Sequence, residues 1–197
     1  MPQLLSTVTR QDREMTDPTW IADFLARAPN GTLATAAIME DGQPQAFTNT
    51  LLFVYHPALH AIYLHTGRRG RMFAHAGPDQ RACFTTFEMG RLLPADTALN
   101  FSVEYASVVA FGRLQVVTDP AEAETALQIL LDKYFPHLHA GADYRPITAG
   151  EREATAVYRL EISEWSAKRK QVAEDFPGAF EYGEFNHEGH ADAPSAA

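Results

Sequence analysis

The segment that decides the fold is residues 62–71, which read IYLHTGRRGR. Its first half is an alternating apolar stretch, which is typical of a β-strand. Two glycines and three arginines follow, and residues 72–75 have the character of a first helical turn. Glycine lets the backbone come close to a ligand, and arginines beside a helix start can hold a phosphate. The segment therefore predicts a pocket for a phosphorylated cofactor, and the alternative is a solvated basic turn.

Composition places the chain among ordinary globular proteins. It has 197 residues, of which 46% are hydrophobic and 11% aromatic, and its net charge is −9. A pI near 5.3 argues against nucleic-acid or anionic-membrane partners, because both need an extended basic face. The first residues have no signal-peptide pattern and no apolar run approaches bilayer length, so we expect a cytoplasmic protein. The single cysteine, Cys83, excludes an internal disulfide and is expected to be a buried structural thiol.

Strand patterns predict a mainly β protein in which helices are few and peripheral. An Asp41-Gly42 turn is expected to join the first two strands, because glycine supplies the positive φ that tight hairpins need. The region 101–117 is long enough for one bent strand or two. The expected strands, six or seven in number, cover residues 32–39, 46–55, 59–65, 81–87, 101–117 and 156–165.

An aspartate followed by proline predicts the start of a helix at two places in the sequence. Asp17 and Asp119 are expected to cap these helices, with proline at the first helical position. Glu122 stands at the capping-box position of the second helix, which is expected to stop before Pro136.

The strands expected at 46–55 and 101–111 are apolar on both faces. One face can fill a small closed barrel, and the other needs cover that two amphipathic helices cannot provide. We therefore expect a homodimer. The domain organisation that we expect is an N-terminal arm (1–15), one domain (16–170) and a loosely ordered C-terminal tail (171–197).

In order and spacing, these features resemble the FMN-binding split-barrel family, which includes pyridoxamine 5′-phosphate oxidase and the 5-nitroimidazole reductase-like flavoproteins. The resemblance covers roughly residues 16–170. It implies a β-barrel with peripheral helices, namely an antiparallel split barrel. The stretches that carry it are residues 24–25 with 30–35, 41–44, 62–65 with Gly70 and Arg71, and 105–112.

The resemblance implies one FMN in each of two clefts at the dimer interface. The loop after the strand would hold the phosphate through His65, Thr66, Gly67, Arg68, Arg69, Gly70 and Arg71. The second strand would lie along the isoalloxazine ring with Thr48, Asn49, Thr50 and Leu51. Trp165 and Lys168 would reach the cofactor from the partner subunit. The flavin carries the redox chemistry, so no catalytic residue is assigned.

Three departures from the family pattern limit this transfer. Met72 stands where many relatives have lysine, although Arg68 and Arg69 can compensate. Relatives often carry proline in the second strand, where this chain has residues 48–50. Residues 178–197 contain no arginine or lysine, whereas a true pyridoxamine 5′-phosphate oxidase needs a basic C-terminal clamp for its substrate. We therefore expect a different activity.

The resemblance favours an oxidoreductase that reduces a small acceptor through bound FMN. NAD(P)H or a flavin reductase would supply the electrons, although no dinucleotide-binding fingerprint follows a strand. A non-catalytic flavin sensor or storage protein and a haem-binding split barrel remain alternatives. His187 and His190 could hold a metal or haem, but a flexible tail rich in polar residues is the preferred interpretation, so no metal site is predicted.

Overall fold

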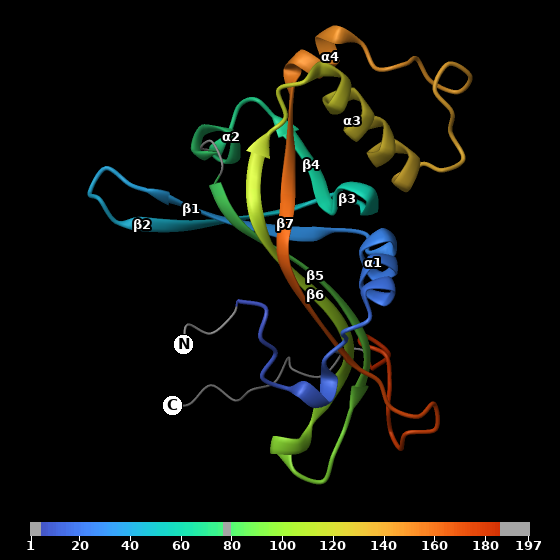
Figure 1. Cartoon of the computed structure of the whole chain (residues 1–197). Helices are drawn as coiled ribbons and strands as arrows, with labels where there is room; N and C mark the ends of the chain where they lie inside the picture. The colour runs from blue at the N-terminus through green and yellow to red at the C-terminus, as the bar shows by residue number, and fades with distance from the viewer. Residues whose placement is uncertain (1–4, 77–79, 186–197) are drawn as a thin grey trace, which may run out of the picture.

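The structure is a computed structural model that describes residues 5–76 and 80–185. Its core is one antiparallel sheet of seven strands in the order β2-β1-β5-β6-β7-β4-β3 (Figure 1). This architecture confirms the predicted mainly β split barrel. The strands are β1 (Gly31–Ile38), β2 (Pro44–Leu51), β3 (Phe53–His56), β4 (Ala61–Gly67), β5 (Gln80–Leu93), β6 (Ser102–Val116) and β7 (Thr155–Lys170).

The barrel closes where β2 meets β3. These strands stand at opposite ends of the strand order, yet only Leu52 separates them in the sequence. The sheet must therefore curl until its two edges come together. Inside, the rings of Phe53 and Phe84 lie 4.7 Å apart and join β3 to β5 across the interior. The single strand expected at 46–55 was thus wrong, because the chain changes its pairing partner at Leu52, from β1 to β4.

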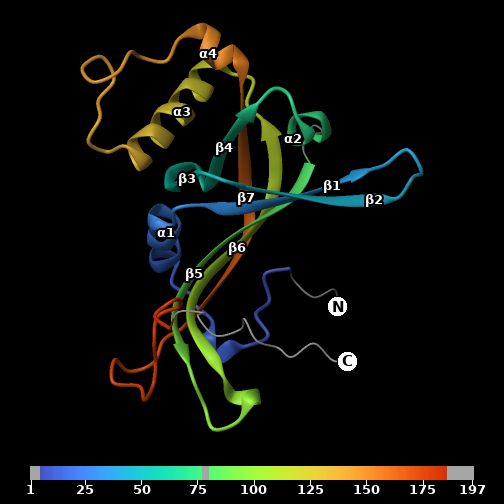
Figure 2. The ribbon, with the colours of Figure 1, turned by 180° about the vertical axis from the view of Figure 1, so that it is seen from behind.

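The region 101–117 forms one strand, β6, bent at a bulge. Phe111 pairs with Glu164 and Gly112 with Ile162, so Ser163 is the extra residue on β7. A Cβ atom at position 112 would lie 1.9 Å from the carbonyl oxygen of Glu161, so only glycine fits there. β5 and β7 are longer than expected, and Figure 2 shows them running with β6 well beyond the barrel.

Both helices expected from Asp-Pro pairs are present. Asp17 caps α1 (Pro18–Arg27) by accepting from the Thr19 amide at 2.9 Å. Asp119 caps α3 (Pro120–Tyr134) by accepting from the amides of Ala121 and Glu122. The Glu122 side chain is not a capping-box partner: its Oε1 accepts from Tyr63 Oη and Arg159 Nη1, both at 2.8 Å. This glutamate therefore ties α3 to the sheet.

The remaining helices are short. The predicted turn after β4 is α2 (Arg71–His75), and α4 (Ala149–Ala154) begins with a capping box between Thr148 and Glu151. Three 3₁₀ turns complete the fold, namely η1 (Gln11–Arg13), η2 (Pro57–Leu59) and η3 (Ala98–Asn100).

β4 shows why helical cover is needed on one side of the barrel. Ile62 and Leu64 face the barrel interior, whereas Ala61 and Tyr63 pack in a second core beneath α3. Alternate side chains of a strand point to opposite faces, so β4 is buried on both. The long strands β5 and β6 lack such cover beyond the barrel: Phe87 is 57% exposed, and Phe101, next to β6, is 60% exposed.

Both ends of the chain contact the sheet. In the arm, the Met15 amide donates to the Ala167 carbonyl at 2.9 Å, and Val8 is buried. In the tail, Leu92 and Phe180 form a β-bridge. The domain boundaries stay a prediction, and His187 and His190 lie outside the described residues.

Candidate functional site

The arginine-bearing loop follows β4 as the sequence predicts. Gly70 is the N-cap of α2 and has φ 132° and ψ 171°, a conformation that L residues rarely adopt. The neighbouring Arg68, Arg69 and Arg71 are exposed. The loop therefore presents three cations around a backbone turn that requires glycine.

These arginines lack carboxylate partners. Within residues 5–76 and 80–185, no aspartate or glutamate forms an ion pair with Arg68, Arg69, Arg71 or Arg81. Aromatic rings support two of them, because Arg71 lies 5.4 Å from the centroid of Phe47 and Arg68 lies 5.7 Å from that of Phe73. Arginines elsewhere do face carboxylates, namely Arg10, Arg13, Arg27, Arg91, Arg145, Arg152 and Arg159.

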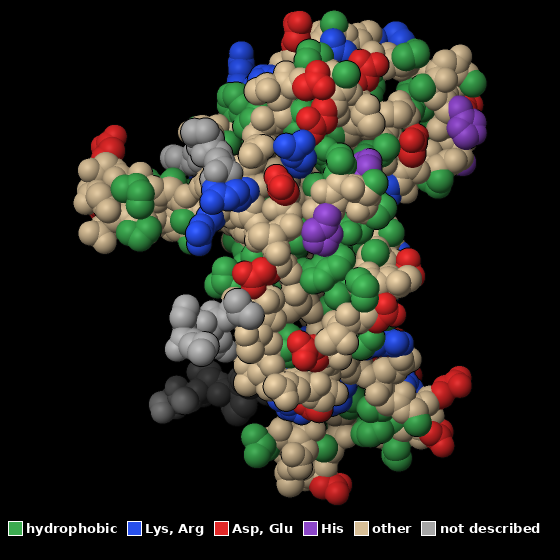
Figure 3. Space-filling model, in the orientation of Figure 1, with side chains coloured by type: hydrophobic (Ala, Val, Ile, Leu, Met, Phe, Trp, Pro, Cys, Tyr) green, Lys and Arg blue, Asp and Glu red, His purple; other side chains and the backbone are tan. Residues whose placement is uncertain are grey.

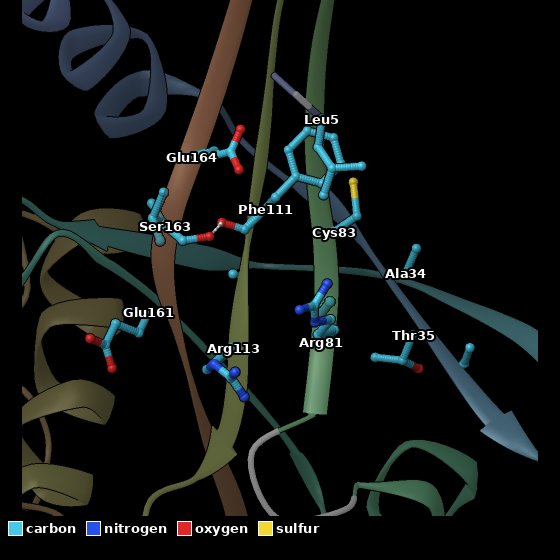
Figure 4. A pocket seen from close by; sticks show the side chains of 14 residues that line it. Leu5, Ala34, Thr35, Arg81, Cys83, Phe111, Arg113, Glu161, Ser163 and Glu164 are labelled. Atoms are coloured by element: carbon cyan, nitrogen blue, oxygen red, sulfur yellow. Dashed lines mark hydrogen bonds between the residues drawn. The ribbon is translucent and has the colours of Figure 1, made fainter. Parts of the chain in front are cut away.

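A groove of about 630 Å³ runs across β1, β5, β6 and β7 beside this loop. Thr35, Arg81, Arg113 and Glu161 line the half toward α2, and Glu164 lines the other end (Figure 4). Lys and Arg side chains gather in the same region, at the base of the β1–β2 hairpin (Figure 3). The groove therefore carries Arg81 and Arg113, together with Glu161, in the half toward α2.

Cys83 also lines the groove, at half-buried depth, rather than lying in the sealed core that the sequence predicts. Partial burial raises the pKa of its thiol, because desolvation disfavours the thiolate. The Cys83 thiol is thus protonated and uncharged where it lines the groove at physiological pH.

The predicted ring-side residues flank the groove without lining it. Thr48, Asn49, Thr50 and Leu51 pair with residues 31–34 of β1, and Ala34 itself lines the groove. The Oγ1 atoms of Thr50 and Thr32 lie 2.9 Å apart. The predicted contact of these four residues with a flavin ring stays a prediction.

Two residues of the predicted phosphate loop direct their side chains elsewhere. Thr66 Oγ1 lies 3.0 Å from Tyr158 Oη. His65 lines a separate pocket beneath α3, where desolvation lowers the pKa of its ring. None of residues 65–71 lines the groove, so the predicted contact of this loop with a phosphate stays a prediction.

Trp165 and Lys168 are not brought to the arginine loop within one chain. The Trp165 ring packs against His60, with centroids 4.5 Å apart. Lys168 pairs with Ser107 in the sheet and forms a β-bridge with Glu14. Their contact with a cofactor across a subunit interface stays a prediction.

Sequence reasoning missed Arg81, Arg113 and Thr35. A signal was present for one of them: Arg81 and Cys83 are two apart on β5 and therefore point to the same side. For Arg113 no local pattern indicated a ligand, because its place beside Arg81 comes from the register of β5 with β6.

The strand order defines a split barrel, with the arginine loop directly after β4. A sequence model described as pyridoxamine 5′-phosphate oxidase matches residues 17–169, and the chain belongs to this family. A comparison with curated proteins found no match.

Solved structures share the fold at low sequence identity. The flavocytochrome Anf3 from Azotobacter vinelandii has a TM-score of 0.70 and 24% identity, with 97% of this chain and 92% of that chain covered. An FAD and haem binding protein from Mycobacterium smegmatis has a TM-score of 0.69 and 22% identity, covering 81% and 74%. A putative 5-nitroimidazole antibiotic resistance protein from Bacteroides thetaiotaomicron has a TM-score of 0.60 and 17% identity, covering 79% and 85%.

Two further tests concern metals and membranes. Across the part of the chain that the structure describes, no group of three or more His, Cys, Asp or Glu side chains is placed to hold a metal ion. In that same part, no helix combines the length and the apolarity needed to cross a bilayer.

Proposed function

We propose that the protein binds FMN, with the phosphate at the arginine loop, which carries Arg68, Arg69 and Arg71, and the ring system along the groove. The observation that carries this proposal is that Arg68, Arg69, Arg71 and Arg81 have no carboxylate partner among the described residues of a chain whose net charge is −9. An acidic protein has enough carboxylates to pair such side chains. Cations left open beside a groove are therefore suited to a dianionic group, because each charge-assisted hydrogen bond contributes roughly 1.5–3 kcal/mol.

The groove suits the rest of the cofactor. Its volume of about 630 Å³ lies within the usual range for small-molecule sites, and Ala34, Ala82 and Phe111 provide apolar walls. Two structural neighbours are named for FAD or for a flavocytochrome, which supports a flavin as the ligand class. FMN is preferred in this proposal because the arginines suit a terminal phosphate.

We propose further that the site is completed in a homodimer, with Trp165 and Lys168 supplied by the partner subunit. Uncovered apolar side chains support this: Ile38 at the end of β1 is 72% exposed, and Phe87 and Phe101, on or beside the long strands β5 and β6, are 57% and 60% exposed. Sedimentation of the FMN-loaded protein should show a dimer. A stable monomer with FMN bound at micromolar concentration would remove this part of the proposal.

In this proposal, bound FMN supplies the redox chemistry of an oxidoreductase, and the protein binds and orients it. The chain accepts electrons from a reduced nicotinamide or a flavin reductase and passes them to a small acceptor. An FMN-loaded sample that turns over no acceptor with either donor favours a flavin sensor or storage protein.

A fluorescence titration with FMN and riboflavin tests the phosphate assignment. The two ligands differ only in the phosphate, so FMN should bind at least tenfold more tightly. Equal affinities contradict the assignment. A visible spectrum of the purified protein separates the remaining alternative, since a Soret band supports haem instead of flavin.

A further inference from the structure

A second pocket lies on the other side of β4 from α2. Its volume is about 320 Å³, and it is bounded by the end of β4, by α3, by α4 and by the connection between these helices. Figure 1 places α3 and α4 on one side of β4 and β7, and α2 on the other. The walls are mainly apolar and include Leu127, Leu131, Phe135 and Ile147.

The connection over this pocket is ordered by its own hydrogen bonds. It spans residues 135–148, and the His139 amide donates to Asp143 Oδ2 at 2.8 Å. Ala140 and Tyr144 form a β-bridge, and Tyr144 Oη accepts from Gln128 Nε2 of α3 at 2.8 Å. Ordered connections of this length commonly serve binding.

The charged groups at the pocket neutralise each other. Arg145 donates to both carboxylate oxygens of Glu151, at 2.9 and 3.3 Å. Hydrogen bonds from Thr148, and then from Arg145, lower the pKa of Glu151 to about 2, so the pair is zwitterionic at neutral pH. The pocket therefore offers no net charge to a ligand at this rim.

His65 adds an exposed polar side chain to the lining of the pocket. Among the described residues, no side chain or backbone group is hydrogen bonded to its imidazole. Desolvation lowers its pKa, so the ring is neutral at physiological pH and can donate or accept one hydrogen bond. A mainly apolar hollow with a single free hydrogen-bonding group is a typical small-molecule site.

The pocket is separate from the flavin groove. The two share no lining residue. On β7, the pocket reaches Thr155 whereas the groove begins at Glu161, which at about 3.3 Å per residue is roughly 20 Å along the strand. A ligand in one hollow therefore does not occupy the other.

We propose that this pocket binds an uncharged aromatic molecule of one or two rings that carries a hydroxyl group hydrogen bonded to His65. The aromatic part would lie among Leu131, Phe135 and Ile147. The volume, at the small end for ligand pockets, limits the size of the molecule. The Arg145–Glu151 pair is an exposed ion pair that leaves no net charge for a ligand at the rim, so the apolar walls favour an uncharged molecule.

The test titrates 2-naphthol, as the probe, into the full FMN-loaded chain, and calorimetry measures the binding. We expect one site per chain with a dissociation constant below about 1 mM, and 2-naphthalenesulfonate should bind at least tenfold more weakly. His65→Leu should weaken 2-naphthol binding about fivefold, which is the value of one neutral hydrogen bond. Leu131→Trp should fill the pocket and abolish binding.

Leu59→Trp is the matched control, because Leu59 is an exposed leucine that lines neither hollow. It should leave 2-naphthol binding unchanged, and neither tryptophan variant should change FMN affinity. The proposal is overturned if the sulfonate binds as tightly as the alcohol, if FMN displaces 2-naphthol, or if no binding occurs up to about 1 mM. Dissociation of a dimer by Leu131→Trp would also overturn it, since the pocket would then be a subunit interface.

Discussion

Arg91 and Arg71 are both arginines, but their guanidinium groups have opposite surroundings. Arg91 lies on the extended part of β5 and donates to Glu104 Oε2 and Oε1 at 2.9 and 3.0 Å. It also donates to the carbonyls of Ala173 and Glu174 in the tail. Arg71, at the start of α2, has an aromatic neighbour and no carboxylate partner in the described chain.

The difference teaches how to separate structural arginines from binding arginines. An arginine whose donors are taken by its own protein fastens elements together; here Arg91 joins β5, β6 and the tail. An arginine without protein acceptors keeps its donors for an anion from outside. The distinction lies in the neighbours, so variants at the two places should affect different measurements.

The largest effect is expected from Glu104→Ala, on stability. Glu104 is 9% exposed and accepts from Arg91 and from the Val172 amide at 2.8 Å. Removing it leaves two donors without their acceptor, which should cost about 2–4 kcal/mol in the free energy of unfolding. Urea unfolding measures this, and FMN affinity of the folded protein should not change.

Glu88→Ala provides the matched control, because the Arg27–Glu88 pair has side chains 53% and 55% exposed. Exposed ion pairs contribute about 1 kcal/mol or less. Equal losses for the two variants would show that the Arg91 contact does not fasten the tail.

Arg71→Ala should show the reverse pattern. We expect a loss of about 1.5–3 kcal/mol in FMN binding, or roughly tenfold to a hundredfold in affinity, because one charge-assisted contact to the phosphate disappears. Riboflavin binding and the free energy of unfolding should barely change. If the variant binds FMN like the parent while truncation after Lys170 abolishes binding, the phosphate site lies elsewhere.

Arg81→Ala should have a smaller effect on the same titration, about 1 kcal/mol or fivefold in affinity. Arg81 lines the groove from β5 and does not belong to the loop. A loss for FMN without a loss for riboflavin would show that groove and loop form one anion site. Equal losses for both ligands would instead place Arg81 beside the ring system.

The smallest effect concerns how the free energy of unfolding depends on pH through Glu104. The hydrogen bonds from Arg91, then from Val172, lower the pKa of Glu104 to about 2, from 4.5. A carboxyl whose pKa is depressed in the folded state contributes stability above its unfolded pKa and loses it as the pH falls through the folded pKa. Between pH 7 and 4.5 the parent should therefore change little through this group.

From pH 4.5 towards 2, the parent should lose this stabilisation progressively, whereas Glu104→Gln should show a shallower slope over the same window. Urea unfolding at a series of pH values measures both slopes. Parallel slopes for the two proteins would show that Glu104 is not the group that titrates.

Local chemistry made much of the fold predictable from the sequence. The Asp17 and Asp119 caps, the Asp41-Gly42 turn, where Gly42 has φ 78°, and the order of strand, Gly70 and short helix all appear as expected. Each depends on hydrogen bonds or dihedral angles within a few residues, so the neighbouring residues contain the information.

The candidate site depended on contacts between distant segments. The apolar pattern of residues 46–55 looks continuous in the sequence. Leu52 interrupts it because β2 and β3 belong to opposite edges of the sheet. Arg81 and Arg113 meet through strand register, and His65 faces α3 although it adjoins the arginine loop. The sequence alone determined the two capped helices, most of the strands and the location of the cationic loop. Only the tertiary structure decided which arginines stay unpaired, because a carboxylate partner can come from any part of the chain that packing brings near.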